Sequence, residues 1–494
     1  MGEAYIIKRQ SNNSAVIKVK TIPNATITCS DGKTNHRRVS DESGVAEFSV
    51  TYGTWTLTKT NSDNTTIDKT VIVNALKVYN VELFSGIFGI QIDQSISDPT
   101  EAVTYTDDAV GLKPLSVNLT TGECDYGDWE GIIKSVFGVR PCLVSNGSVY
   151  KYLNPNDYTK TEDGMDVSSI IQTGNYDVMV EFKKTWYKWE ESGNIIKFTL
   201  SDHFINTTYR DYAFATELYD PNCAASVLDA VICDYMYYGA YEGCISNNSL
   251  RSLSNKTPYV YSKDVSLNYN TLKEIRGYAN GNNTLNSGIE SFFKYNYILS
   301  LLLLVTKSRD LLSKLGYGVI RSSNGLIKPT GTLNNRGLFC GFDESSGKSI
   351  KCFGIENLWG NTHRYCDGIL IGTSEQYLVD KQIFFRISPP HDQTARSFVP
   401  ITSKVTRDQT LYTSTMTTNG YVIIPNAAQA DNSIGWVSSV HVRNELNIRG
   451  AIISGYENST TFGPWGFALC VNTSDTSISY NDVGARIVMT PSIS

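Results

Sequence analysis

Few residue patterns in this sequence carry recognisable chemistry. Residues 341–349 end in Gly-Lys-Ser like a phosphate-binding loop, but five residues separate the two glycines where four are needed. The five histidines lie far apart and show no spacing of zinc ligands. Asp107 and Asp108 are adjacent carboxylates that could bind a hard cation, although acids in a turn usually cap it or bond its loop. We therefore predict no catalytic residue, no metal site and no cofactor.

Composition narrows the class of protein further. Hydrophobic residues make up 41 % and charged residues 19 % of the chain, and the net charge is −6. A large core is therefore expected, and the acidic balance argues against a nucleic-acid partner. The most apolar run, residues 297–305, is far shorter than the roughly 20 residues that cross a bilayer. We expect no membrane insertion.

The N-terminus and the cysteines indicate where the chain is made. Its first residues lack the basic segment and apolar stretch of a signal peptide. The ten cysteines contain no C-x-x-C pair. We therefore expect reduced, buried thiols in a protein synthesised in a cytoplasm.

Three separated segments combine residue types that suit close backbone packing. A Trp-Gly-Asn triplet favours a tight turn, because glycine supplies backbone freedom, asparagine bonds neighbouring backbone groups and tryptophan anchors the loop. In the other two segments, Gly450 follows Arg449 and Gly484 lies two residues before Arg486. Both glycines suit strand ends or bulges where backbones approach closely. These structural motif residues are Trp359, Gly360, Asn361, Arg449, Gly450, Gly484 and Arg486.

The elements that must position these residues begin with a predicted β-sandwich over residues 1–84. Phe48, Val50 and Tyr52 alternate with polar residues, which predicts one buried face of a strand. Further strands are expected at 15–22, 54–58, 70–73 and 78–83. Short strands separated by polar turns favour a sandwich.

The middle of the chain, residues 85–250, is expected to be β-rich. Residues 177–182 alternate as a strand does. Trp186, Tyr187 and Trp189 follow closely, and such a cluster more often packs in a core than forms a sugar platform.

Two helices are predicted after residue 250. Thr271–Glu274 and Ser287–Glu290 both match the capping-box pattern, and Gly281 and Gly316 are placed to end the helices. In the second helix an apolar face runs from Ile289 to Leu304. Leu302 and Leu303 broaden that face, so we expect a core helix buried on more than one side.

Two resemblances add expectations about fold. Through residues 41–48 and 52–57, the stretch 23–83 resembles transthyretin-like and carboxypeptidase-regulatory-like modules, which implies a spacer or mount. Over about 250–490, the order of the Trp-Gly-Asn, Arg-Gly and Gly-Ala-Arg segments resembles the C-type-lectin-like fold in its formylglycine-generating-enzyme subfamily. That subfamily shows G-N-x-W-E-W, R-G-G-S-W and G-F-R, and it includes both the enzymes and ligand-binding variable proteins of phage tails and bacterial surfaces.

Departures from these motifs favour the ligand-binding group. His363-Arg364-Tyr365 stands where the enzymes have Trp-Glu-Trp, and residues 449–453 lack the second glycine and the tryptophan. Cys470 has no partner at a matching position for the copper-binding cysteine pair of the enzymes.

A third resemblance covers about 86–370. Residues 88–93, 103–111, 140–143, 152–157, 178–184 and 238–243 are similar to tail or minor structural proteins of phages. This likeness implies a virion protein of the phage tail that is made in the host cytoplasm without a signal peptide.

Together these arguments predict a mixed fold, an N-terminal all-β sandwich (1–84) followed by a large α+β C-type-lectin-like domain with insertions. The region 85–250 would be its β-rich first part and 251–494 its ligand-binding part. The predicted function is a non-enzymatic phage tail receptor-binding protein, which recognises its ligand through rigid aromatics and adaptable polar groups. The expected receptor-contacting residues are Tyr456, Glu457, Asn458, Phe462, Trp465, Asn472, Thr473, Ser474 and Tyr480.

The resemblance also implies partners, namely a bacterial cell-surface glycan or protein, other tail proteins, and two further copies in a homotrimer. Two alternatives remain open from the sequence. One is a purely structural tail or baseplate protein. The other is an enzyme, either of the formylglycine-generating type or a polysaccharide depolymerase.

Overall fold

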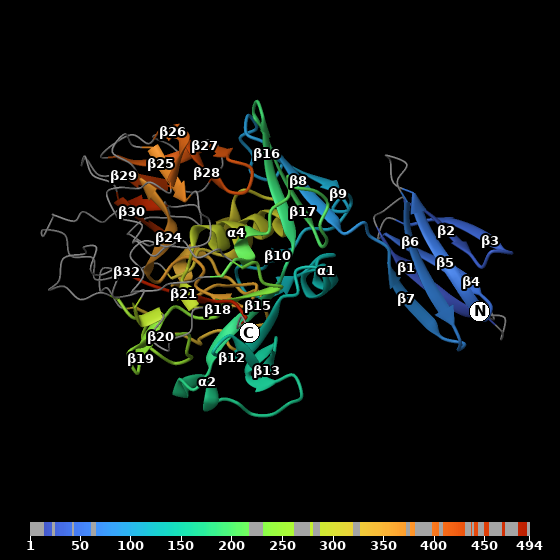
Figure 1. Cartoon of the computed structure of the whole chain (residues 1–494), viewed down its shortest axis with the longest axis horizontal. Coiled ribbons are helices and arrows are strands. Elements are labelled where there is room, and N and C mark those ends of the chain that lie inside the picture. The colour runs from blue at the N-terminus through green and yellow to red at the C-terminus, as the bar shows by residue number, and fades with distance from the viewer. Residues whose placement is uncertain are drawn as a thin grey trace, which may run out of the picture. The chain divides into compact units, whose positions relative to one another are not determined.

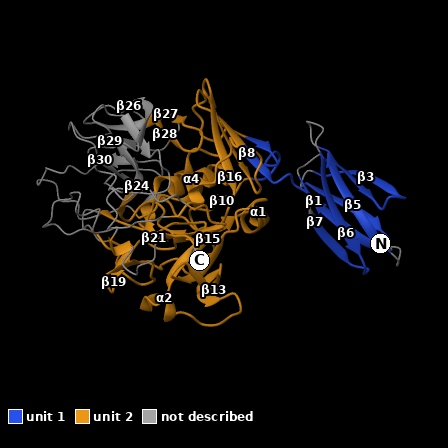
Figure 2. Ribbon diagram, in the orientation of Figure 1, with its two compact units in different colours: residues 1–89, 105–113 blue, residues 90–104, 114–494 orange. Residues whose placement is uncertain are grey.

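The computed structural model contains two compact units, residues 1–89 with 105–113 and residues 90–104 with 114–494 (Figure 2). The chain is mostly β-sheet with few helices, the β-rich mixed fold that the sequence predicts (Figure 1). The structure describes residues 14–21, 25–41, 44–60, 66–216, 231–260, 277–279, 287–319, 327–371, 376–380, 398–404, 409–429, 436, 439–442, 449–453, 467–469 and 483–491.

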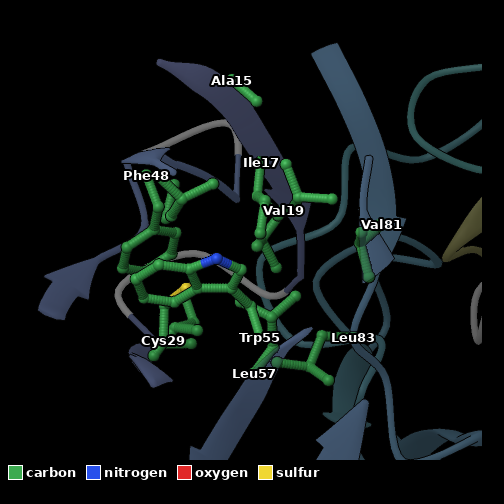
Figure 3. Close-up of a cluster of buried hydrophobic side chains, with 14 residues drawn as sticks. Ala15, Ile17, Val19, Cys29, Phe48, Trp55, Leu57, Val81 and Leu83 are labelled. Carbon is green, nitrogen blue, oxygen red and sulfur yellow. The ribbon is translucent and has the colours of Figure 1, made fainter. Parts of the chain in front are cut away.

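The first unit contains two antiparallel-rich sheets that share one core. One sheet has the order β4 (Val45–Val50), β1 (Ala15–Lys20) and β7 (Val78–Glu82). The other has the order β3 (Asn35–Val39), β2 (Thr26–Ser30), β5 (Gly53–Thr60) and β6 (Thr66–Val73). Side chains from both sheets, among them Ile17, Phe48 and Trp55, fill the core between them (Figure 3).

Most strands of this unit agree with the sequence-based prediction, but the end of β4 and two whole strands do not. Phe48 and Val50 are buried as expected, but Tyr52 is 61 % exposed because the chain leaves β4 at Val50. The turn at Asp31 forms as predicted, since its carboxylate accepts the backbone N–H groups of Lys33 and Thr34. Strands β2 and β3 were missed; β3 is largely exposed and has no apolar alternation, whereas β2 does alternate, with Ile27 and Cys29 buried.

Of the adjacent acids at 107 and 108, Asp108 is buried and connects separate segments of this unit. Asp108 forms an ion pair with Lys59 at 2.9 Å, and the two side chains are only 3 % and 2 % exposed. The other carboxylate oxygen of Asp108 accepts from Ser85 Oγ and from the backbone of Gly86. The carboxylate thus has donors from three residues, as the loop-bonding interpretation of the acid pair requires.

In the second unit a seven-stranded sheet carries much of the core. Its order is β14 (Asp157–Thr161), β13 (Ser148–Asn154), β12 (Arg140–Ser145), β15 (Asp177–Lys183), β18 (Tyr235–Gly239), β33 (Ile487–Met489) and β21 (Ser287–Ile289). The expected strand at 177–182 is β15, and it is buried on both faces because it lies at the centre of this sheet. A four-stranded sheet has the order β16 (Trp186–Ser192), β17 (Ile195–Ser201), β8 (Ile87–Asp93) and β9 (Val103–Asp107).

A nine-stranded sheet contains most of the described residues after 362. Its main path runs β26 (Phe398–Lys404), β25 (Gln376–Asp380), β24 (His363–Ile371), β30 (Arg449–Ile453), β31 (Phe467–Leu469), β29 (Ser439–Val442), β27 (Gln409–Thr418) and β28 (Ile423–Gln429), with β32 (Val483–Gly484) also pairing with β24. The described residues also form three two-stranded sheets: β10 (Ser116–Val117) with β11 (Cys124–Asp125), β19 (Cys244–Ser246) with β20 (Ser249–Arg251), and β22 (Lys351–Cys352) with β23 (Ile355–Glu356).

The predicted helix between residues 289 and 315 is wrong in its start and its continuity. Ser287–Ile289 form strand β21, which pairs with β33, so the expected capping box is not one. Helix α4 spans Phe292–Thr306 and ends at Lys307 in the left-handed conformation, and a separate helix α5 (Leu311–Leu315) ends at Gly316. The two short helices α1 (Glu130–Ser135) and α2 (Ile170–Thr173) were not predicted. The first expected helix, from Thr271, lies almost entirely outside the described residues.

Helix α4 is a core element, as the sequence predicts, and all 15 of its residues are buried. Its polar side chains are paired with neighbouring elements. Asn296 exchanges two hydrogen bonds with the backbone of Ile423, and Ser300 accepts the indole N–H of Trp189. Tyr187 and Trp189 are buried against this helix, so these two members of the aromatic cluster are core packing, whereas Trp186 is half-buried and contacts the exposed Phe204.

Within the described part of the chain, no helix combines the length and apolar character that crossing a bilayer requires.

Candidate functional site

The predicted Trp-Gly-Asn turn is present and lies in the core of the second unit. Trp359 is fully buried, and its indole N–H donates to the backbone oxygen of Gly316 at 3.0 Å. Gly360 adopts a φ of +83°, and a Cβ there would meet the backbone nitrogen of Val319 at 2.8 Å. The position therefore requires glycine on two counts, its left-handed backbone and the close approach of a second chain segment.

Asn361, the last residue of the turn, connects two distant segments. Its side-chain carbonyl accepts the backbone N–H of Lys328 at 2.8 Å, and its amide group donates to Lys328 O and to the carboxylate of Glu242. Glu242 also accepts from the amide of Asn357 at 3.0 Å and from the hydroxyl of Thr362. Both oxygens of this buried carboxylate are therefore occupied by side chains of the 357–362 loop.

A second buried carboxylate lies opposite the arginine that follows this loop. Arg364 Nε donates to Glu290 Oε2 at 2.8 Å, and the Tyr238 hydroxyl donates to Glu290 Oε1. Arg364 also donates to the backbone oxygens of Asn357 and Leu358. Burial alone would lower the pKa of Arg364, but the charge of Glu290 and its hydrogen bonds raise that pKa overall.

Arg486 supplies a further buried charge to this centre. Its guanidinium donates to the backbone oxygens of Gly239, Glu356 and Asn357 at 2.8–2.9 Å. Burial, with the nearby positive charge of Arg364, lowers its pKa to about 10, so the group remains charged at neutral pH. We call the set Glu242, Glu290, Asn361, Arg364 and Arg486 the buried polar centre.

The strand register explains why residues so far apart in the sequence meet here. Arg364 of β24 pairs with Gly484 of β32 on one side and with Ile453 of β30 on the other, and Ile453 pairs with Phe467 of β31. The structure thus brings together the three segments that the sequence analysis singled out. Gly484 serves a close approach as predicted, since a Cβ there would meet the backbone oxygen of Tyr259 at 2.4 Å.

The chemistry that this centre can perform is limited by its burial. Its charged side chains are bonded to each other, to neighbouring side chains or to backbone oxygens, and none of its five side chains is exposed. Two atoms in or beside it, Asn357 Oδ1 and Arg486 Nε, have no hydrogen-bond partner among the described residues. The described residues also contain no group of three or more His, Cys, Asp or Glu placed to hold a metal ion. The centre acts as a scaffold that fixes the ends of surrounding strands.

Sequence reasoning identified this centre only in part. Trp359, Gly360, Asn361, Gly484 and Arg486 were singled out, but their partners Glu242 and Glu290 were not. Glu290 was assigned to a helix cap, whereas it follows strand β21 and bonds Arg364. The backbone of Arg449 and Gly450 pairs with Ile371 and Leu370 of β24.

The predicted receptor-contacting residues fall beyond what the structure describes. They are Tyr456, Glu457, Asn458, Phe462, Trp465, Asn472, Thr473, Ser474 and Tyr480, in the segments 454–466 and 470–482. The structure describes the residues that flank these segments. Ile453 and Phe467, which bound the first one, are paired with each other, and Val483, which follows the second, pairs with His363.

A further pair of buried charges lies near this centre. Lys351 and Glu356 face each other across β22 and β23, and Lys351 Nζ donates to the backbone oxygen of Leu333 while lying 3.6 Å from the ring centroid of Tyr158. Burial lowers the pKa of Lys351 to about 7 and raises that of Glu356. No pattern in the sequence marks this pair, because both strands have only two residues.

Comparison with known proteins adds little to this geometry. No family model matches the chain, and no curated protein matches it. Among solved structures, a DUF3823 family protein from Bacteroides ovatus is similar over 38 % of this chain and 95 % of that chain, at 9 % sequence identity and a TM-score of 0.14. A likeness this low supports no statement about fold or function.

Proposed function

We propose that this protein is a phage tail receptor-binding protein that attaches the particle to a ligand on the bacterial surface. In this proposal the large unit contains a C-type-lectin-like domain, and its segments 454–466 and 470–482 contact the receptor. The first unit serves as the mount toward other tail proteins, and three copies act together, so that weak single contacts gain from multivalency. The protein is made in the host cytoplasm and functions in the virion.

The observation that carries the proposal is the row of paired residues Gly484, Arg364, Ile453 and Phe467. The first segment leaves the sheet at Ile453 and returns at Phe467 in this row, and the second returns at Val483 beside it. Both segments therefore have an end at one place in the nine-stranded sheet. Binding residues commonly lie on loops whose ends are held by a rigid scaffold.

The buried polar centre supports the same proposal, because it fixes the strands from which the two segments leave. Arg364 lies in the row, and its guanidinium binds Glu290 and two loop carbonyls in the core. The described motif residues 359–361, 484 and 486 therefore hold strand ends in place, and their side chains are not available to a reactant in solution. This division, with fixed motif residues and separate contact segments, suits recognition better than catalysis.

Binding of labelled, full-length protein to whole cells of candidate hosts tests the proposal. The informative variant carries Tyr456→Ala, Asn458→Ala and Trp465→Ala together. A matched control carries Phe204→Ala and Tyr235→Ala, two exposed aromatic positions of the same unit. Both variants must keep the oligomeric state and melting temperature of the parent.

Host-selective binding that is lost in the triple variant and kept in the control supports the proposal. Absence of binding to every host contradicts it and favours a structural tail protein, in which the same surface would be covered in the assembled particle. Equal binding by all three proteins overturns the assignment of the contact residues. Release of sugar from host wall material would favour the depolymerase alternative.

A further inference from the structure

The four-stranded sheet of the first unit has one face toward the core and one toward solvent. Trp55 and Leu57 of β5 belong to the core (Figure 3), and because side chains alternate along a strand, the threonines between them point outward. Residues directly opposite each other on neighbouring strands share a face, so the register assigns the whole outward side. We call it the threonine face. None of its side chains is buried, and they are Asn35, Arg37 and Val39 of β3, Thr26, Thr28 and Ser30 of β2, Thr54, Thr56, Thr58 and Thr60 of β5, and Thr66, Asp68, Thr70 and Ile72 of β6.

The charged residues of the threonine face are one arginine and one aspartate, at its two opposite edges. Arg37 lies opposite Thr28, Thr28 opposite Thr58, and Thr58 opposite Asp68, so all four form one line across the sheet. Three strand spacings separate the two charges, about 14 Å, which is too far for them to pair with each other. The described residues provide neither side chain with another ionic partner. The face is therefore neutral overall but positive at one edge and negative at the other.

A second copy of this face, turned by 180° about an axis parallel to the strands, complements it. The rotation places β3 of each copy over β6 of the other, and β2 over β5, because the strand order is β3, β2, β5 and β6. Along the charged line, Arg37 then lies opposite the partner's Asp68 at one edge, and Asp68 opposite the partner's Arg37 at the other. Such a two-fold contact uses the same patch on both copies and has to match itself.

The uncharged residues of the face match themselves under the same rotation. A threonine or serine hydroxyl is both a donor and an acceptor, so Thr28 meets the partner's Thr58 with complementary groups. Val39, which is 59 % exposed, lies over the methyl group of the partner's Thr66. A second copy thus covers the face without leaving a charge or a hydroxyl unpaired. An unrelated partner would need an acid and a base at this same spacing.

The size of the face sets the strength of the contact. Four strands about 4.8 Å apart and about six residues long cover roughly 400 Å² per copy, about half of what each partner buries in a standard stable interface. We therefore expect a weak contact, with a Kd above about 10 μM for two isolated faces. Particles that carry several copies would strengthen it through multivalency.

We propose that the threonine face is a self-association surface, through which the first units of two copies bind each other with an Arg37–Asp68 ion pair at each edge. The proposal goes beyond receptor binding, because it concerns the first unit and its partner is a second copy of this chain. It is also separate from the proposed trimer, since a two-fold contact joins copies in pairs.

Sedimentation equilibrium of the full-length protein tests the contact, from about 1 μM to about 500 μM at low salt, where exposed charges act most strongly. The test variants are Arg37→Glu and Asp68→Arg, each alone and then mixed in equal amounts. Each variant alone sets like charges opposite each other at both edges, whereas a mixed pair restores opposite charges at both. Arg38→Glu is the matched control, because Arg38 is exposed on the same strand but lies opposite Ile27, on the other face of the sheet.

We expect the parent and the control to associate equally, each test variant to associate at least about tenfold more weakly, and the mixture to regain the parental affinity. A parental mass that does not change with concentration, a mixture no stronger than its components, or a control as weak as Arg37→Glu would each overturn the proposal. Melting temperatures equal to that of the parent show that the fold is kept. A trimer formed elsewhere raises the mass of every sample equally. Cell binding through residues 454–482 is measured separately, so the two proposals fail separately.

Discussion

Arg364 and Glu290 form an ion pair in which both side chains are completely buried, with Nε and Oε2 2.8 Å apart. The pair joins strand β24 to the residue that follows β21, 74 positions earlier in the chain. Tyr238 and the carbonyls of Asn357 and Leu358 complete the hydrogen bonding of the two charges. Arg364 also belongs to the row of paired residues at which the proposed receptor-contacting segments begin and end. This row is therefore held by an ion pair that is fully buried from solvent.

Replacing Arg364 by Met should strongly destabilise the second unit. The change leaves Glu290 as a buried charge without its partner, a situation that costs about 3–5 kcal/mol. The free energy of unfolding in urea measures the effect. The control is Arg140→Met, which removes an ion pair with Glu162 at an exposed site and should cost no more than about 1 kcal/mol. Equal losses in the two variants would contradict the structural role of the buried pair.

Gly360→Ala should also destabilise the protein, by about 2–4 kcal/mol, since it combines a left-handed backbone with a steric clash. The new Cβ would meet the backbone of Val319 at 2.8 Å. Gly347→Ala is the matched control, because Gly347 has a positive φ but a Cβ added there would have no other atom within 4 Å. Its expected cost is only about 1–2 kcal/mol. A Gly360→Ala variant no less stable than Gly347→Ala would show that the loop relaxes.

Local patterns in the sequence were enough to predict features whose causes are local. The alternation around Phe48 and Val50 predicted a strand with a buried face, and the Trp359 triplet predicted a tight turn, because both depend on neighbouring residues. Even there the predicted strand ran too far, and Tyr52 was placed on the buried face although it is exposed.

Features that depend on distant partners were beyond prediction. Ser287–Glu290 matches a capping box, but the pairing of residues 287–289 with β33, about 200 positions later, makes it a strand instead. That pairing also brings Glu290 to Arg364. The polar pocket lined by Asn146, Asn175 and Ile487 likewise draws on a turn after β12, a segment before β15 and strand β33, and no single stretch of sequence contains enough of its lining residues to predict it.

The described cysteines should react slowly in the folded protein. Burial raises the pKa of Cys29 and Cys244 to about 11 and that of Cys124 to about 12, and raises those of Cys142 and Cys352 as well. Because the thiolate is the reactive form, alkylation by iodoacetamide at pH 8 should be at least about 100-fold slower for these residues than in guanidinium chloride. Mass spectrometry of peptides locates the label. Rapid native labelling of Cys142 or Cys352 would show that the core opens readily.

The buried Lys351 should make stability depend on pH in a defined direction. Burial lowers its pKa from 10.5 to about 7 in the folded protein, whereas the unfolded chain keeps the ordinary value. Between these two values the unfolded state binds more protons than the folded state, so the free energy of unfolding rises with pH. The cost of burying this charge is thus fully present below about pH 7 and declines above it.

Lys351→Met removes this contribution, and it also removes the positive charge that lowers the pKa of Glu356. Relative to the variant, the parent should gain about 2 kcal/mol in its free energy of unfolding between pH 7 and pH 9, since each unit of pH contributes at most about 1.4 kcal/mol. Urea unfolding at several pH values gives both curves. Lys134→Met, at an exposed lysine paired with Glu130, should instead stay parallel to the parent. If the Lys351→Met curve were also parallel to the parent, Lys351 would have the same pKa in both states, and water would have to reach its ammonium group between β22 and the ring of Tyr158.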